Sequence, residues 1–240
     1  MGIARTRVVT LGVTVGGAIA IAALAAPSAA TAAPAAPAGP TVGVLAAPPI
    51  VPLATITLDS SQAPDLADWL NNQVGPALNT WYPRVQQELG GTAPASFSVT
   101  ISSTYTGVAF TSGTRVVLSA QYFRAHPSDI GATVHESVHV AQQYRGIEGW
   151  AVEGVADWFR FYRYVTTGVR KPPASASWTA GYRTTAYFFE YIRTHYDAEF
   201  LRKLHASGQN GGPNAETLIQ QSTGKSAADV WTEMQSVATA

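Results

Sequence analysis

Residues 130–142 read IGATVHESVHVAQ, and this stretch decides how the rest of the chain is interpreted. His135 and His139 are four residues apart, so on a helix both imidazoles project from the same side. The stretch also carries an apolar stripe at helical spacing, formed by Ile130, Val134, Val138 and Ala141. We therefore expect a helix that packs on a core, with Ser128 as its N-cap.

Two imidazoles at this spacing predict a metal site. A catalytic zinc ion has three protein ligands and an open fourth position, and two His with one carboxylate is a known set. Glu153, fourteen residues after His139, is the expected third ligand. Glu136 is rotated by about 100° from His135 on the helix, beside the metal, and is the expected general base. Asp157 is expected to accept the far N–H of His135 and so fix its tautomer.

A three-histidine zinc site does not fit the sequence. The pattern HExxHxxGxxH requires Gly at position 142 and His at position 145, which are Gln142 and Arg145. A structural zinc site would need a fourth protein ligand, and only three are evident. The plainer alternative is that the histidines lie on a solvated helix face and that Glu153 and Asp157 form an ordinary charge pair.

Composition limits the possible functions. The 240 residues are 46% hydrophobic, with 15 basic and 15 acidic residues. The balanced charge and the lack of a basic stripe argue against a nucleic-acid partner or an anionic membrane surface. The chain has no cysteine, which excludes disulfides and Cys-ligated metals.

The N-terminal region has the pattern of an export signal. Arg5 and Arg7 precede an apolar stretch, which is followed by small residues up to Ala32. We expect a signal peptide over residues 1–32 and a secreted, extracellular protein with no membrane contact after cleavage. An uncleaved membrane anchor is the alternative. Residues 33–54, rich in Ala and Pro, are expected to form a linker or pro-region, and residues 55–240 one domain.

The remaining pattern predicts an α+β fold, in which a small N-terminal sheet is followed by a mainly helical half that carries the HExxH zinc site. Pro76 and Pro83 are expected to break the helical pattern of residues 65–88. The expected strands are 97–102 and the hairpin 107–111 with 115–119. Further helices are expected from the Glu153 region to residue 165, at 182–196 and at 227–237.

A hydrolytic site also needs a donor for the developing oxyanion. Tyr182 is the preferred candidate and Tyr187 the second. Three other histidines, His126, His195 and His205, have weaker claims to a role in the site.

Several motifs resemble those of the basic secretory proteins, a group of zinc metallopeptidases of plants and microbes. The resemblance extends from about Phe97 to the C-terminus. The segments that carry it are residues 107–111, 118–122, 135–143, 152–157, 178–186 and 223–231. The zinc motifs are specific signals, whereas the flanking ones mostly indicate shared packing.

The resemblance implies a thermolysin-like (gluzincin) site. In such a site His135, His139 and Glu153 hold one zinc ion, Glu136 is the catalytic base, and Asp157 is the buried carboxylate after the ligand Glu. One departure is that this chain has no excess of basic residues. Adhesion to cell walls by charge is therefore doubtful.

The leading hypothesis is a secreted zinc metallopeptidase that hydrolyses peptide bonds of an extracellular protein or peptide with a zinc-activated water and Glu136 as general base. Internal and aminopeptidase-like cleavage are both open, as is the oligomeric state. The alternatives are a secreted binding or defence-type protein with a vestigial or structural zinc site, and a cell-wall amidase.

Overall fold

The computed structural model describes residues 54–166 and 169–237, which fall within one unit that runs from Pro48 to Ala240. The predicted signal peptide over residues 1–32 lies outside the described residues, as does all but the last residue of the predicted linker. Among the described residues, no helix has both the length and the apolar character needed to cross a bilayer.

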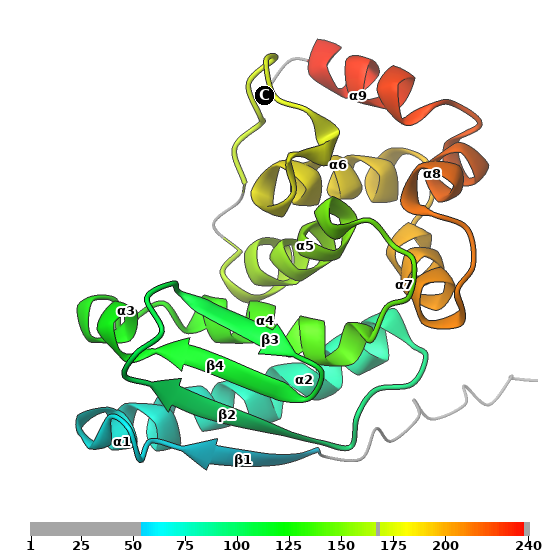
Figure 1. Cartoon of the computed structure of the whole chain (residues 1–240). Coiled ribbons are helices and arrows are strands. Elements are labelled where there is room, and N and C mark those ends of the chain that lie inside the picture. The colour runs from blue at the N-terminus through cyan, green and yellow to red at the C-terminus, as the bar shows by residue number, and fades with distance from the viewer. Residues whose placement is uncertain (1–53, 167–168, 238–240) are drawn as a thin grey trace, which may run out of the picture. The chain divides into compact units, whose positions relative to one another are not determined.

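A mixed four-stranded sheet forms one part of the fold (Figure 1). The strands are β1 (Thr55–Asp59), β2 (Ser96–Ser102), β3 (Ala109–Ser112) and β4 (Arg115–Ser119), in the order β1-β2-β4-β3. β1, β2 and β4 are parallel, and β3 pairs antiparallel with β4 at the edge. The predicted strand and hairpin are confirmed, whereas β1 was not predicted.

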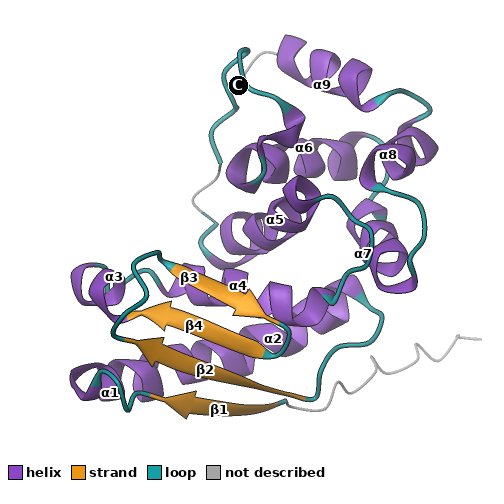
Figure 2. Ribbon diagram, viewed as in Figure 1, coloured by secondary structure: helices purple, strands orange, loops and turns teal. Residues whose placement is uncertain are grey.

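Helices make up most of the rest (Figure 2), as the α+β prediction expects. In chain order they are α1 (Ala67–Trp69), α2 (Gly75–Leu89), α3 (Ala120–Ala125), α4 (Ile130–Gln142), α5 (Gly149–Trp158), α6 (Tyr182–His195), α7 (Phe200–Asn210), α8 (Ala215–Thr223) and α9 (Ala227–Ser236). A π-helical turn, Leu70–Val74, joins α1 to α2, and a π-helical segment, Phe159–Tyr164, continues α5. The predicted helices near residues 182–196 and 227–237 are α6 and α9.

The expected break at Pro83 is wrong, because α2 continues through this residue. Proline removes the hydrogen bond to the carbonyl of Asn79, but Asn79 is solvent-exposed, so water can satisfy that carbonyl. The opposite side of α2 is held by burial of Leu78, Tyr82, Val85 and Leu89. Pro76 lies in the first turn of α2, where a proline is tolerated.

α4 lies at the centre of the fold, between the sheet and the helical layer (Figure 1). Twelve of its thirteen residues are buried, so burial extends well beyond the predicted apolar stripe. The predicted N-cap, Ser128, is wrong, since the residue before α4 is Asp129 and its side chain makes no cap. The Asp129 carboxylate instead accepts hydrogen bonds from Tyr122 and Arg160, at 2.8 and 2.9 Å. This contact joins the start of α4 to the segment after α5.

α5 and α6 pack very closely where they cross at Gly154. A Cβ atom at this position would lie 2.3 Å from Cγ2 of Thr185 and 3.0 Å from the ring of Phe189. Real Cβ atoms do not approach so closely, so only glycine fits the observed spacing. The crossing places α5, which carries Glu153 and Asp157, against the first turns of α6.

Gly154→Ala is therefore expected to lower the free energy of unfolding by about 1–3 kcal/mol, because the added methyl group overpacks the crossing. The matched control is Gly149→Ala at the start of the same helix, where a Cβ atom meets nothing within 4 Å. That change is expected to be neutral or to stabilise by up to about 1 kcal/mol, through the unfolded chain. Urea unfolding of both variants checks the difference, and equal stabilities would contradict the tight crossing.

Candidate metal centre

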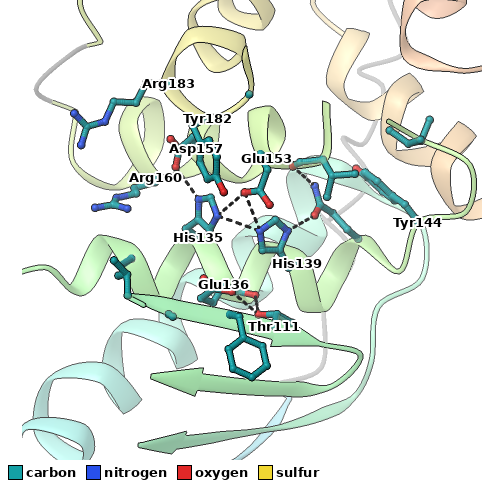
Figure 3. Close-up of a pocket in the computed structure, with 18 of the residues that line it drawn as sticks. Thr111, His135, Glu136, His139, Tyr144, Glu153, Asp157, Arg160, Tyr182 and Arg183 are labelled. Atoms are coloured by element: carbon teal, nitrogen blue, oxygen red, sulfur yellow. Dashed lines mark hydrogen bonds and ion pairs between the residues drawn. The ribbon is translucent and has the colours of Figure 1, made fainter. Parts of the chain in front are cut away.

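Three ligand atoms from two helices converge on one point (Figure 3). Nε2 of His135 and Nε2 of His139, both on α4, lie 3.0 Å apart. The Oε2 atom of Glu153, on α5, lies 3.2 Å from the first nitrogen and 3.4 Å from the second. These three residues form a group that could hold one metal ion.

The other ring nitrogens fix the tautomers. Nδ1 of His135 donates to Oδ1 of Asp157 at 2.7 Å, and Nδ1 of His139 donates to Oε1 of Gln142 at 2.7 Å. The Gln142 amide nitrogen donates to the carbonyl of Val152, which settles which end of that side chain is oxygen. In the neutral histidines each Nε2 atom then carries a lone pair and no hydrogen.

Two lone pairs and a carboxylate oxygen in one place repel each other unless a cation lies between them. Ligands bound tetrahedrally at about 2.05 Å lie about 3.3 Å apart, close to the three distances found here. Two imidazoles and one carboxylate also leave a fourth position for water or substrate. The donor set and its geometry therefore fit a single divalent ion of the catalytic type.

Without a metal, a proton can take the cation's place. Burial opposes the charged form of His135, but hydrogen bonds to Asp157 and Glu153 outweigh it and raise its pKa to about 9. Burial likewise opposes the ionised form of Glu153, but hydrogen bonds from His135 and His139 lower its pKa to about 2. The site is therefore built to hold positive charge.

Glu136 lies on the other side of the two histidines, between α4 and β3 (Figure 3). The hydroxyl of Thr111, on β3, donates to Oε2 of Glu136 at 2.6 Å and lies 3.1 Å from the Glu136 carbonyl. Among the described residues, the second carboxylate oxygen has no hydrogen-bond partner. Thr111 thus holds one oxygen and leaves the other available to take a proton.

Tyr182 lies over His135 at the start of α6. The two rings are nearly parallel, with centroids 6.2 Å apart, and the Tyr182 side chain is 56% exposed. Its φ of 49° is unusual for a residue other than glycine and costs conformational energy. The Glu153 carboxylate, and then burial, raise the pKa of the Tyr182 hydroxyl. The hydroxyl therefore stays protonated and can donate a hydrogen bond.

The other candidates lie elsewhere. Tyr187, His126, His195 and His205 are not among the residues that line the cleft around the ligands. His126 stacks on Tyr122, and His195 is bonded to the carbonyl of Tyr191 on its own helix. His205 is buried, and burial lowers its pKa to about 4.

Two residues that hold the site together were missed from the sequence. Thr111 was noted only within the predicted hairpin and a family motif, and Gln142 only within a family motif and as a departure from the three-histidine pattern. The position of Gln142, three residues after His139 on the same helix, was a usable signal. Thr111 gave no such signal, because its contact with Glu136 spans 25 residues.

The ligands lie in a cleft of about 1400 Å³, larger than a typical small-molecule pocket. Edge strand β3 lines one side, through Ala109, Phe110 and Thr111. The start of α6 lines the other, through Tyr182 and Arg183. A cleft of this size with a strand edge along one wall suits an extended chain.

The shifted pKa of His135 leads to a test of stability in the metal-free protein. Because the folded pKa lies above the ordinary value of 6.5, the stabilisation is complete below about pH 6.5 and is lost as the pH rises through about 9. With the metal removed by EDTA, Asp157→Asn should therefore cost about 2 kcal/mol at pH 6 and much less at pH 10. Thermal unfolding followed by circular dichroism at both pH values gives the two differences.

The control is Glu190→Gln. Burial opposes the ionised form of Glu190, but its hydrogen bonds with Arg193 and Trp158 lower its pKa, so this carboxylate stays charged throughout the range. Its substitution should cost the same at both pH values. A cost for Asp157→Asn that does not change with pH would show that the charged His135 contributes no stability.

A family model named BSP, described as a peptidase of plants and bacteria, matches residues 58–234, well over half of the chain. No curated protein and no solved structure matches this chain. The match includes all six residues of the predicted site and begins before Phe97, where the motif resemblance starts. The chain therefore belongs to the BSP family, the peptidases of plants and bacteria.

Proposed function

We propose that this peptidase is a secreted, zinc-dependent metallopeptidase that cleaves extracellular proteins or peptides. The observation that carries the proposal is the convergence of His135, His139 and Glu153, whose three ligand atoms, from two helices, lie 3.0–3.4 Å apart. Zinc is the favoured ion because imidazole and carboxylate ligands with one open position are its usual catalytic set.

Zinc, when bound, would supply a Lewis acid that polarises a peptide carbonyl and lowers the pKa of a water. Glu136 is proposed to take the proton of that water on the oxygen that Thr111 does not hold. The same carboxyl group would then give the proton to the leaving amine. The Tyr182 hydroxyl, which lies at the start of α6 over His135, is proposed to donate to the developing oxyanion. Asp157 and Gln142 keep the imidazoles in the tautomers that the ion requires.

The strand edge supports a peptide as substrate. β3 ends the sheet order, so its outer backbone groups have no partner strand among the described residues. An extended peptide can add to such an edge through main-chain hydrogen bonds. Since Thr111 on β3 also holds Glu136, a peptide bound there would lie next to the proposed base.

The first test is the hydrolysis of a broad peptide library by the wild type and by Glu136→Gln, together with their zinc content. We expect about one zinc ion per chain in both proteins and a fall in kcat of at least about 100-fold in the variant, because the base is lost while the ligands remain. Elemental analysis and peptide mass spectrometry provide the two readouts.

Glu88→Gln is the matched control, since Glu88 pairs with Arg163 outside the cleft, and this variant should retain activity. A wild type that holds zinc but cleaves no peptide would reject the proposal in favour of a binding or defence-type protein. Cleavage of peptidoglycan but not of peptides would identify a cell-wall amidase instead.

Thr111→Val tests how the base is held. Valine keeps the branched shape that suits a strand but removes the hydroxyl that donates to Glu136 at 2.6 Å. Because a hydrogen bond to a charged group is lost, we expect kcat to fall about tenfold, with the zinc content unchanged. Thr111→Ser should restore most of the activity. If Thr111→Val cleaves as fast as the wild type, Thr111 does not position the base.

A further inference from the structure

The cleft continues past the three metal ligands to an end that carries two arginines, Arg160 and Arg183. Figure 3 shows both guanidinium groups on the His135 side of the ligands, away from Tyr144. Arg160 belongs to the π-helical segment after α5, and Arg183 is the second residue of α6. Neither has a part in the chemistry proposed above.

The two guanidinium groups contact the same aromatic ring. Cζ of Arg183 lies 4.3 Å from the ring centroid of Phe161, and Cζ of Arg160 lies 4.8 Å from it. Cation–π contacts of this kind hold each group in place without neutralising it. Two like charges are thus held around one ring at the same end of the cleft.

Among the described residues, a single carboxylate, that of Asp129, pairs with these two arginines. One terminal nitrogen of Arg160 donates to both oxygens of Asp129, at 2.9 and 3.0 Å, while Nε of Arg160 is buried and has no partner. Within residues 54–166 and 169–237, Arg183 makes no hydrogen bond and no ion pair through its side chain. One positive charge and several N–H donors therefore remain for a ligand.

The net charge of the whole cleft also favours an anionic ligand. Its lining includes three carboxylates, Glu136, Glu153 and Asp157, and three arginines, Arg145, Arg160 and Arg183. These charges cancel, so a bound divalent ion would leave the cleft with a net positive charge. The positive cleft would then attract an anionic group of the substrate. The end with Arg160 and Arg183 is the part that the metal-site carboxylates do not occupy.

The direction of β3 indicates which part of a substrate reaches this end. After β3, the carbonyl of Gly113 accepts from Gln143, which follows α4, so β3 and α4 run in the same direction. Arg160 is bonded to Asp129, directly before α4, at the opposite end. A peptide that pairs antiparallel with β3 therefore runs toward the arginines, with its C-terminal part nearest to them.

We infer that Arg183, with Arg160 at the same end of the cleft, binds a carboxylate on the C-terminal side of the scissile bond and sets a preference for substrates that carry one there. The planar guanidinium offers paired N–H donors that match the two oxygens of a carboxylate. The carboxylate comes either from the end of the peptide or from an Asp or Glu side chain. This inference rests on the proposed function, since it assigns a specificity to the same cleft.

The test compares quenched fluorescent peptides that differ in one group. One peptide ends in an amide and has Gln after the scissile bond. A second ends in a free acid, and a third set keeps the amide and replaces Gln by Glu at successive positions. The wild type should cleave at least one carboxylate peptide about tenfold more efficiently in kcat/KM than the neutral one, mostly through KM.

Arg183→Met should remove this advantage and leave cleavage of the neutral amide within about twofold. Arg84→Met is the matched control, because Arg84 is also exposed and lies over an aromatic ring, Trp81, but outside the cleft. It should keep the full preference. A preference for the free acid alone identifies the chain end as the source, and a preference for Glu over Gln identifies the side chain.

Two results would overturn the inference while leaving the peptidase intact: equal cleavage of charged and neutral peptides by the wild type, or an equal loss for both in Arg183→Met. If the wild type cleaves none of the peptides, the proposed function fails. A measurement of peptide binding then tests the role of Arg183 separately. Fluorescence anisotropy on Glu136→Gln, with and without Arg183→Met, should then show carboxylate peptides bound about tenfold more weakly by the double variant. Equal binding would reject the carboxylate site.

Discussion

The hydrogen bond from His135 to Asp157 is the interaction on which the site depends. It joins α4 to α5 through two buried side chains, 2.7 Å apart, and it puts the proton on Nδ1 so that Nε2 faces the other two ligand atoms. The contact requires α5 at a fixed distance, and the close crossing at Gly154 holds α5 from its other side. Helix packing and ligand chemistry are therefore parts of one arrangement, and neither is complete without the other.

Local spacing made much of the site predictable. His135 with His139, and Glu153 with Asp157, are pairs four residues apart on helices, and a period of 3.6 residues dictates which groups share a face. The structure brings all four together, and His135 donates to Asp157 as expected. The hairpin of β3 and β4 and the strand β2 were predictable for the same reason, since alternation and a short turn are local signals.

The features that were missed depend on contacts far apart in the chain. Thr111 reaches Glu136 across 25 residues, and β1 joins the sheet only by pairing with β2, about forty residues later. Pro83 did not break α2, because burial of one helix face outweighed a local rule. Ser128 is not the residue before α4; that residue is Asp129, whose side chain is bonded to Arg160 in a contact between distant segments. Tyr182 was selected from the sequence, but its left-handed backbone could not be anticipated.

The open edge of β3 has a consequence for the solution behaviour of the protein. Val108 and Phe110 are both 39% exposed along this wall of the cleft, beside backbone groups that have no partner strand among the described residues. Native proteins usually cover or charge such an edge, because it can template strand addition from another molecule. Here covering it would close the wall of the cleft. Resistance to aggregation would thus favour a covered strand at residues 109–112, whereas access for an extended chain requires the same four residues to be open.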